Sequence, residues 1–368
     1  MDRIGETTLE IDLSALEHNY KFLTSRIAPG TKFMAVVKAM AYGSEVVAIA
    51  KKLEELEVDY LAVAYVKEGV LLRDAGITTP ILVLHPQPVH FKELIDRCLE
   101  PSLYSPKVLL QFLDVAQRQQ QQDYPVHIKF NTGLNRLGFW ENDVDFVIGT
   151  LKGRTELRIK GVLSHLAASE DENEREFSLN QINTFTKICL DLKEKLGYLP
   201  MRHVLNTSGI LNYPEAQFEM VRSGIGLYGY GNHPDFDKKM KPVATLKTVI
   251  SQRHKIEPGE SVGYNRAYTS DGYRITATLP IGHADGIGRQ YGNGKALVYV
   301  KGTPAPIIGN VCMDMIMIDV SGIDCKEGDE VIIFGAGHSA EDFAHSAQSI
   351  SYEILTAIAP RVTRVIKW

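Results

Sequence analysis

Short apolar runs alternate with longer amphipathic stretches between residues 30 and 230. A short apolar run between polar flanks is typical of a strand that is buried on both faces. The pattern predicts such strands at Met34–Val37, Tyr60–Ala64, Ile81–Leu84, Pro101–Tyr104, Val126–Phe130, Lys160–Ser164, His203–Leu205 and Met220–Val221.

The stretches between these runs have the periodicity of amphipathic helices. In the first of them, Val46, Ile49 and Leu53 fall on one helical face and charged residues fall on the other. Because each strand precedes a helix or a shorter connection, we expect a closed (β/α)8 barrel rather than an open doubly wound sheet. The helices are expected at Ser44–Leu56, Val66–Ala75, Val89–Cys98, Pro106–Gln119, Asp143–Leu151 and Phe177–Leu196.

After Pro242 the pattern changes to alternating apolar and polar residues with turn residues between the segments, which predicts strands. These strands are expected at Thr245–Ile250, Tyr273–Leu279, Lys295–Val300, Gly309–Val320 and Glu330–Phe334, before a helical segment at 341–358 and a basic tail. The predicted fold class is therefore α/β. An N-terminal (β/α)8 barrel of the TIM type occupies residues 10–240, and a mainly-β domain occupies residues 241–368 together with an N-terminal strand at 1–9.

Composition and charge exclude several functional classes. The chain has a formal net charge of -5 with both signs scattered along it, so no basic stripe marks it as a nucleic-acid binder. It has no apolar stretch long enough to span a bilayer and no signal-peptide pattern, so we expect a cytoplasmic protein without membrane contact. The four cysteines form no CxxC pair, and alternation along the expected strand would separate Cys312 from Met313, so no metal site is expected.

Polar residues collect at the carboxyl ends of the predicted strands, where the reactive groups of such barrels lie. They are Lys38, His85, Tyr104, Lys129, His165, Asn206 and Arg222. A mouth with this many cations suits a ligand that carries phosphate and carboxylate groups. Lys38 is the most informative of them, because partial burial at the end of an apolar strand favours a neutral, nucleophilic amine.

The segment Ala35–Gly43 resembles the pyridoxal-phosphate attachment segment of alanine racemases, in which a strand leads to lysine, a short turn, tyrosine and glycine. Further matches follow in the same order over nearly the whole chain: Lys129–Gly138, Asn206–Ser208, Val221–Gly229, Gly263–Tyr264, Cys312–Asp314 and Tyr352–Leu355, with Arg361 and Arg364. The resemblance implies a fold-type III enzyme that requires pyridoxal 5'-phosphate.

The resemblance also implies a two-base mechanism. Lys38 attaches the cofactor and acts as one base, and Tyr264 acts as the second base on the opposite face of the substrate. In the family this tyrosine comes from the partner subunit, which implies a homodimer with shared active sites. A phenol with an ordinary pKa near 10 must be shifted by a few units to work near neutrality, and neighbouring cations are expected to supply the shift.

The other site residues follow from the same resemblance. Arg222 is expected to face the pyridine nitrogen and, because arginine keeps its proton, to leave that nitrogen unprotonated and the cofactor a weaker electron sink. Cofactor contacts are expected at Tyr42, His165, Asn206, Thr207, Gly224, Ile225 and Tyr352. Arg136 and Met313 are expected to hold the substrate carboxylate, and Lys129 corresponds to a lysine that is carbamylated in some members and is an ordinary amine in others.

Several positions depart from the usual family pattern without removing a catalytic group. They are Asn131, Thr207–Ser208, Ser223, Asn265, His283 and Asn310. We expect these changes to alter the access channel and the support of Arg136, and so the rate and the substrate range more than the reaction type.

The sequence thus predicts an isomerase that interconverts L- and D-alanine and supplies D-alanine for peptidoglycan. A broader racemase for small amino acids, including serine, is the nearest alternative. A fold-type III decarboxylase of basic amino acids is less favoured, because those enzymes pair the pyridine nitrogen with an acidic residue and lack the Gly263–Tyr264 base. A non-catalytic carrier of pyridoxal phosphate is disfavoured by the additional β domain, since such carriers consist of the barrel alone.

Overall fold

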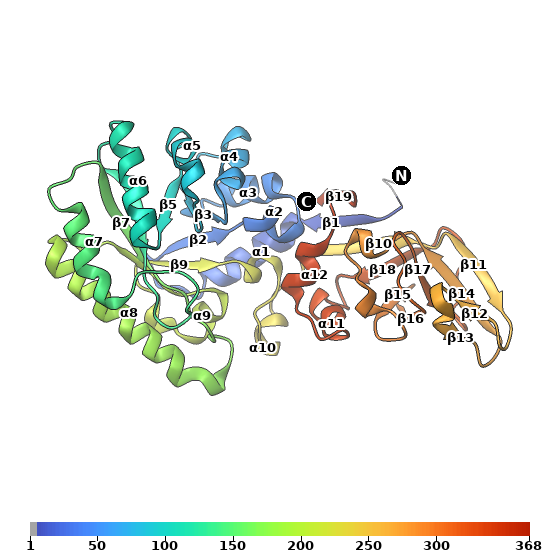
Figure 1. Cartoon of the computed structure of the whole chain (residues 1–368). Helices are drawn as coiled ribbons and strands as arrows, with labels where there is room; N and C mark the ends of the chain where they lie inside the picture. The colour runs from blue at the N-terminus through green and yellow to red at the C-terminus, as the bar shows by residue number, and fades with distance from the viewer. Residues whose placement is uncertain (1–5) are drawn as a thin grey trace.

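The computed structural model describes residues 6–368, so the first five residues of the expected N-terminal strand lie outside the described part of the chain. Two large sheets and one two-stranded ladder make up the described strands. Figure 1 shows an elongated molecule with the helix-covered barrel at one end and the second large sheet at the other.

The N-terminal sheet has the strand order β8-β7-β6-β5-β4-β3-β2-β9, and every neighbouring pair in it is parallel. Its two edge strands approach each other, and Arg222 N donates to Leu205 O at 3.1 Å. The predicted barrel is therefore confirmed as a nearly closed one. Its strands are β2 (Lys32–Val36), β3 (Tyr60–Val63), β4 (Ile81–Val83), β5 (Glu100–Leu103), β6 (Tyr124–Lys129), β7 (Leu157–Leu163), β8 (Met201–His203) and β9 (Met220–Ser223).

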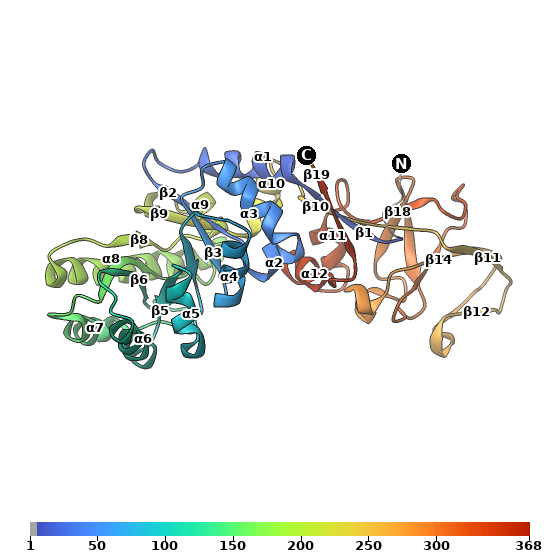
Figure 2. The same ribbon diagram turned by 90° about the horizontal axis from the view of Figure 1, so that it is seen from above.

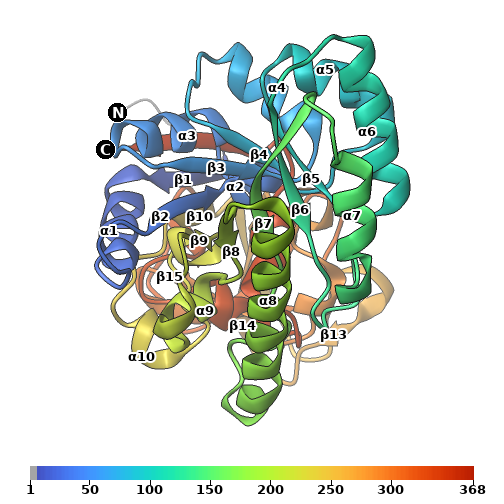
Figure 3. The ribbon, with the colours of Figure 1, turned by 90° about the vertical axis from the view of Figure 1, so that its left-hand side faces the viewer.

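Helices surround these strands, as Figure 3 shows from the barrel side. The α-helices of this part are α1 (Leu13–Thr24), α2 (Lys38–Gly43), α3 (Val46–Glu55), α4 (Val66–Asp74), α5 (Phe91–Asp96), α6 (Pro106–Arg118), α7 (Val144–Leu151), α8 (Arg175–Leu196), α9 (Thr207–Asn212) and α10 (Pro234–Asp237). Short 3₁₀ helices are η1 (Pro88–His90), η2 (Glu141–Asp143), η3 (Glu172–Glu174), η4 (Pro214–Ala216) and η5 (Ile225–Tyr228).

The second sheet has the order β11-β14-β17-β16-β15-β18-β10-β1-β19. Its strands are β1 (Thr8–Asp12), β10 (Ala244–Val249), β11 (Gln252–Ile256), β14 (Arg274–Leu279), β15 (Leu297–Val300), β16 (Thr303–Ile308), β17 (Ile316–Asp319), β18 (Glu330–Phe334) and β19 (Thr363–Lys367). The remaining elements are the ladder β12 (Ser261–Val262) with β13 (Tyr268–Thr269), the 3₁₀ helices η6 (Tyr264–Arg266), η7 (His283–Asp285) and η8 (Arg289–Tyr291), and the helices α11 (Ala340–His345) and α12 (Ser351–Ala357). The mainly-β second part is confirmed.

Two sequence predictions in this second part are wrong in detail. The strand expected at Gly309–Val320 is limited to β17, because Gly309 has a φ of 63° and Cys312 and Met313 lie in a loop bonded to His283 and Ala284. Alternation along a strand therefore does not separate the sulfur atoms of this loop.

The expected helical segment at 341–358 is split into α11 and α12, because Gln348 between them has a φ of 57°. The expected basic tail contains β19, which pairs in parallel with β1.

Helix α12 joins the two ends of the molecule. A Cβ atom on Gly43 would lie 2.0 Å from the carbonyl oxygen of Leu355, so only a glycine at the end of α2 lets the helix approach this closely. Arg364 on β19 donates to the Gly43 carbonyl at 2.9 Å. The segment that follows Lys38 is therefore held directly by the C-terminal part of the chain.

Candidate active site

A cavity of about 620 Å³ opens at the carboxyl ends of the barrel strands. It brings together most of the side chains that the sequence places at this mouth: Lys38, His85, Lys129, His165, Asn206 and Arg222, joined by Tyr42, Arg136, Thr207, Gly224, Ile225 and Tyr352. Tyr104 is the exception. Its hydroxyl group donates to Pro86 O at 3.3 Å and accepts from Gln87 beside the cavity, and it does not line the cavity wall.

Lys38 stands where β2 ends and an unusual turn begins. The next four residues, Ala39 to Tyr42, have φ values of 53° to 55° and ψ values of 45° to 55°, so α2 is a left-handed turn built without glycine until Gly43. Left-handed geometry costs an L-residue about 1–2 kcal/mol. Contacts from elsewhere in the fold must therefore hold this turn.

Glu68 supplies one of those contacts, to Ala39, and two further contacts to the backbone that follows β3. One carboxylate oxygen accepts from Ala39 N at 2.6 Å, and the other accepts from Ala64 N at 2.7 Å and from Tyr65 N at 3.1 Å. Burial and the charge of Arg136 lower the pKa of Lys38, and Glu68 opposes that shift. The amine is therefore partly desolvated, as expected from its place at the end of an apolar strand.

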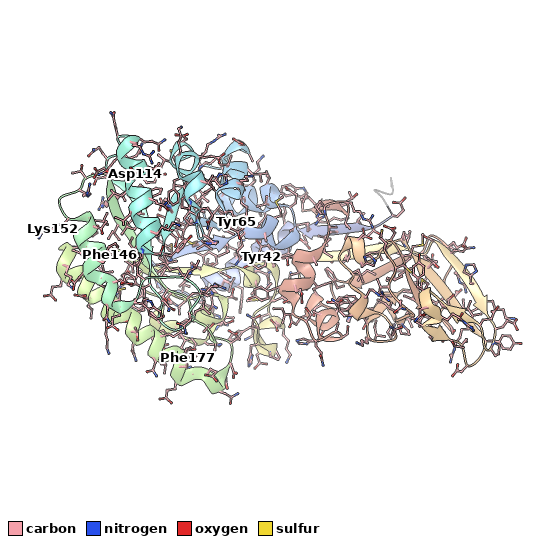
Figure 4. The ribbon with its side chains drawn as sticks, viewed as in Figure 1. Tyr42, Tyr65, Asp114, Phe146, Lys152 and Phe177 are labelled. Atoms are coloured by element: carbon pink, nitrogen blue, oxygen red, sulfur yellow. The ribbon has the colours of Figure 1, made fainter. Side chains whose placement is uncertain are left out.

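Hydroxyl groups and glycines shape one side of the cavity. Tyr42 is buried, and its ring packs 4.5 Å from the Tyr228 ring and 6.0 Å from the Tyr352 ring, measured between centroids. Figure 4 shows Tyr42 and Tyr65 on the part of the barrel that faces the C-terminal sheet. A Cβ atom on Gly224 would lie 2.1 Å from Tyr42 Oη, so the backbone and the hydroxyl group approach each other only because this residue is glycine.

The start of α9 forms the neighbouring wall. The Asn206 side chain accepts from Gly209 N at 2.9 Å and caps the helix, and Thr207 Oγ1 accepts from Gly226 N at 3.3 Å. Hydroxyl groups and the ends of two short helices thus face the same space as Gly224 and Ile225. Such a group of donors fits a phosphate.

Arg222 lies on β9 and is almost fully buried. Its terminal nitrogens donate to His203 Nδ1 at 2.8 Å and to the carbonyl groups of His203 and Ser164 at 2.6 Å each. Among the described residues, none accepts a hydrogen bond from its Nε–H group. Burial lowers the pKa of Arg222 to about 10, so the guanidinium remains a donor at neutral pH.

Lys129 and His165 also line the cavity. Burial lowers the pKa of Lys129 to about 8, and the charges of Arg136, Arg222 and Lys38 act in the same direction. His165 Nδ1 lies 3.4 Å from Arg222 Nη2, and burial together with these cations puts the pKa of His165 well below its ordinary value. No Asp or Glu side chain lines this cavity in the described chain.

The departures at Asn131 and Asn310 have visible roles. The Asn131 side chain accepts from Asn135 N at 2.9 Å and donates to Asn135 Oδ1 at 2.8 Å, so it shapes the loop before Arg136 without touching that arginine. Asn310 Nδ2 donates to Tyr264 O at 3.0 Å. Both asparagines therefore fix backbone next to candidate site residues.

Tyr264 and Met313 line a different cavity of about 390 Å³ on the C-terminal part of the chain. Their side chains are 72% and 59% exposed. Figure 1 places β12 and β13, which flank Tyr264, at the end of the C-terminal sheet that is remote from the barrel, and Figure 2 shows β12 at the same end. The two groups therefore do not join the barrel cavity of their own chain.

Sequence reasoning missed Glu68 and His203. Glu68 occupies the third position of α4, where an acidic side chain commonly caps a helix, so the helix-start pattern offered a signal for it. His203 lies inside a predicted strand and had no such signal.

The described residues contain no group of three or more His, Cys, Asp or Glu side chains placed to hold a metal ion. Within residues 6–368 no helix combines the length and the apolar composition of a membrane span.

The donors fit pyridoxal 5'-phosphate in position and in chemistry. A partly desolvated lysine, a hydroxyl-lined cradle that a methyl group on Gly224 would fill, and an unpaired Arg222 N–H group face one cavity. The fold and the site together define a barrel enzyme of the class that uses this cofactor.

Comparison with known proteins gives the family. The family models described as alanine racemase, N-terminal domain, and alanine racemase, C-terminal domain, match residues 11–232 and 243–366. The alanine racemase of Clostridium novyi is 36% identical over 369 residues, with 97% of this chain and 94% of the relative covered. That of Halothermothrix orenii is 36% identical, with 98% and 97% covered. The chain belongs to the alanine racemase family of pyridoxal-phosphate-dependent isomerases.

Solved structures agree. The alanine racemase of Clostridium difficile 630 superposes with a TM-score of 0.92 at 34% identity, with 100% of this chain and 97% of that chain covered. The Bartonella henselae alanine racemase, solved with covalently bound pyridoxal phosphate, gives a TM-score of 0.90 at 28% identity, with 99% and 100% covered. The Bacillus anthracis alanine racemase, solved with bound L-Ala-P, gives 0.91 at 29% identity, with 100% and 96% covered.

Proposed function

We propose that the protein is a homodimer that interconverts L- and D-alanine with two bases, Lys38 of one subunit and Tyr264 of the other. The observation that carries this proposal is the separation of the two groups within one chain. Lys38 lines the barrel cavity, whereas Tyr264 and Met313 are exposed on the remote part of the C-terminal domain. A second copy that places this surface over the barrel mouth completes the site, and exchange between identical surfaces is the usual geometry of a twofold dimer.

The bound cofactor supplies an electron sink that makes the substrate α-proton acidic. Lys38, at the end of β2, takes or returns that proton on one face of the substrate, and the burial that lowers its pKa favours the neutral amine that accepts a proton. Tyr264 of the second copy exchanges a proton on the opposite face. One base removes a proton while the other delivers one, so the configuration inverts with no net change in protons.

The remaining side chains of the cavity bind the cofactor and orient it. We assign the cofactor phosphate to Tyr42, Thr207, Tyr352 and the backbone at Gly224 and Ile225, because these groups share one wall of the cavity. We also assign cofactor contacts to His165 and Asn206, which line the same cavity. Arg222 would offer its Nε–H group to the pyridine nitrogen of the bound cofactor, which could accept it only when unprotonated.

The substrate carboxylate needs cationic and amide donors. Arg136 lines the barrel cavity from the loop that Asn131 shapes, and we propose that it binds the carboxylate together with the Met313 amide of the second copy. Arg361 bonds Asp314, the residue after Met313, at 2.7 Å and Asp285 of η7 at 2.6 Å, and so ties the loop that carries this amide to η7.

Lys129 is proposed to be carbamylated. A neutral amine attacks carbon dioxide, forms an N–C bond and releases one proton, which leaves a negative carbamate. A pKa of about 8 makes a useful fraction of this amine neutral near pH 7 to 8. The carbamate would place a negative charge among Lys38, Arg136 and Arg222, in a cavity whose described lining contains no carboxylate.

We assign residues 10–240 to the cofactor-binding barrel and 241–368, with the N-terminal strand, to the domain that completes the site of the other subunit. A cytoplasmic location and the supply of D-alanine for peptidoglycan go with this activity. The Bacillus anthracis structure holds L-Ala-P, which supports alanine as the substrate here. Strictness for alanine remains a prediction, because one methylene group changes discrimination by only about 1–3 kcal/mol.

The experiment that tests the proposal follows exchange of the α-proton with solvent deuterium, starting separately from L- and D-alanine. Tyr264→Phe is expected to impair exchange from one enantiomer much more than from the other, because only one face loses its base. Tyr273→Phe, which removes the hydroxyl group of an exposed tyrosine on the same domain, is the matched control and should behave like the wild type. Equal impairment from both enantiomers would contradict the two-base assignment.

Turnover on other substrates tests the alternatives. Release of carbon dioxide from ornithine or lysine would establish a decarboxylase instead. Racemisation of L-serine at the rate of L-alanine would establish the broader racemase.

A further inference from the structure

A line of hydrogen bonds leads from Arg222 away from the cavity, through the interior of the barrel, to Glu100. Arg222 Nη1 lies 2.8 Å from His203 Nδ1, and His203 Nε2 lies 2.9 Å from His127 Nδ1. His127 Nε2 lies 3.0 Å from Glu100 Oε2. The four residues stand on β9, β8, β6 and β5, and both histidines are fully buried.

The donors along this line can point in only one direction. A guanidinium group donates and never accepts, so His203 Nδ1 must be unprotonated. The proton of neutral His203 then lies on Nε2 and is donated to His127 Nδ1, which puts the proton of His127 on Nε2, facing the Glu100 carboxylate. Protonating either ring a second time would set two N–H groups against each other.

The barrel makes room for this line. A Cβ atom on Gly161 would lie 2.2 Å from His127 Nδ1, so glycine is required beside this ring. The β6–β7 ladder shifts register between Val126 and His127 and skips Lys160. Lys160 Nζ lies 2.7 Å from Glu100 Oε1, at the opposite side of that carboxylate from His127.

The charges at the two ends of the line suggest what it does. Four cationic side chains line the active-site cavity and no carboxylate does so in the described chain, while Glu100 is itself buried. Burial alone would raise the pKa of Glu100, but its bonds to His127 and Lys160 lower it, so Glu100 is an anion. Each hydrogen bond in such a line polarises the next, so this anion acts on Arg222 through the two histidines.

We propose that Glu100, His127 and His203 are positioning residues that fix the orientation of the Arg222 guanidinium and set its strength as a donor toward the cofactor ring. The proposal rests on the proposed function, because it concerns the same site. Arg222 keeps its remaining N–H group directed to the cavity because its other donors are held by His203 and by backbone carbonyls. Glu100 acts through this line without touching cofactor or substrate.

The first test measures the protons themselves. Nitrogen-15 NMR of the holoenzyme labelled on histidine, with resonances assigned through His127→Gln and His203→Gln, is expected to show both rings neutral with the proton on Nε2. A proton on Nδ1 of His203, or a doubly protonated ring, would overturn the proposal. This readout does not depend on turnover, so it decides the proposal even if the protein fails to racemise alanine.

The second test removes the charge and keeps the shape. In Glu100→Gln the amide oxygen can still accept from His127, and Arg222 still fixes the direction of the line, so the NMR spectrum should keep both rings protonated on Nε2 while the negative charge is lost. We expect kcat to fall by about 10-fold and KM to change by less than about 2-fold, the size expected when one charge-assisted hydrogen bond in a transition-state contact is weakened.

The matched control is Ser102→Ala on the same strand as Glu100. Ser102 is fully buried and lies opposite His127 in the β5–β6 ladder, and its hydroxyl group has no hydrogen-bond partner in the described chain, so this change perturbs the surroundings of the line without removing any of its hydrogen bonds. A kcat for Glu100→Gln that equals that of Ser102→Ala would overturn the proposal. If Glu100→Gln does not fold, the tautomers of His127 and His203 in the wild-type protein, measured in the first test, decide whether the proposal holds.

Discussion

Replacing Ala39 by glycine should stabilise the protein, which is the reverse of what glycine does in an ordinary helix. Ala39 is exposed and has a φ of 53°, so its methyl group contributes strain and little burial. Relief of left-handed strain is worth about 1–2 kcal/mol, and the extra freedom of glycine in the unfolded chain costs about 0.5–1 kcal/mol. The expected net gain is therefore about 0.5–1 kcal/mol in the free energy of unfolding.

Ala48→Gly is the matched control, because Ala48 lies in the right-handed helix α3. There the same change should destabilise the protein by about 1 kcal/mol. Urea unfolding of the holoenzyme, followed by far-ultraviolet circular dichroism at one protein concentration, compares the two variants with the wild type. A loss of stability in Ala39→Gly equal to that in Ala48→Gly would refute the left-handed turn that fixes Lys38.

Further predictions concern the same cavity. Gly224→Ala should weaken cofactor binding by about 10- to 100-fold, because the added methyl group would overlap Tyr42. Gly149→Ala is the control and should leave binding unchanged, because its methyl group meets open space; titration of the apoenzyme with pyridoxal phosphate measures both affinities. Glu68→Ala should lower the free energy of unfolding by about 1–3 kcal/mol through its lost backbone bonds, measured by the same urea unfolding. A carbamate signal from ¹³C-labelled carbon dioxide should grow from pH 7 to pH 9, as the amine of Lys129 with its pKa of about 8 loses its proton, and Lys129→Arg should abolish it; a signal that persists in Lys129→Arg would assign the carbamate elsewhere.

The barrel could be predicted from the sequence because its strands are buried on both faces and are therefore continuous apolar runs. The expected strand at Met34–Val37 is observed as β2 at Lys32–Val36, a shift of the boundaries only. The cationic mouth followed from the same pattern, because the carboxyl ends of parallel barrel strands share one face.

The left-handed turn could not be predicted in this way. Ala39 to Tyr42 contain no glycine, and local preference favours a right-handed turn. Glu68 from α4 and the close approach of Leu355 on α12 impose the geometry, and both are tertiary contacts.

The line from Arg222 to Glu100 was equally hidden, because a histidine inside an apolar strand gives no sign of what it faces. Tyr264 is the opposite case, since its role was predicted although the single chain does not place it at the site. Its role was predicted only through resemblance to a family, because it lies far from Lys38 both in the sequence and in the single chain.

Mixed dimers test the central claim most directly. Lys38→Ala and Tyr264→Phe subunits, each with little activity alone, are dissociated, mixed in equal amounts and reassociated, and alanine racemisation is measured. If each site takes its two bases from different subunits, half of the dimers carry one intact site, and the mixture should recover about a quarter of wild-type activity. Activity no higher than the average of the two parents would contradict a site shared between subunits.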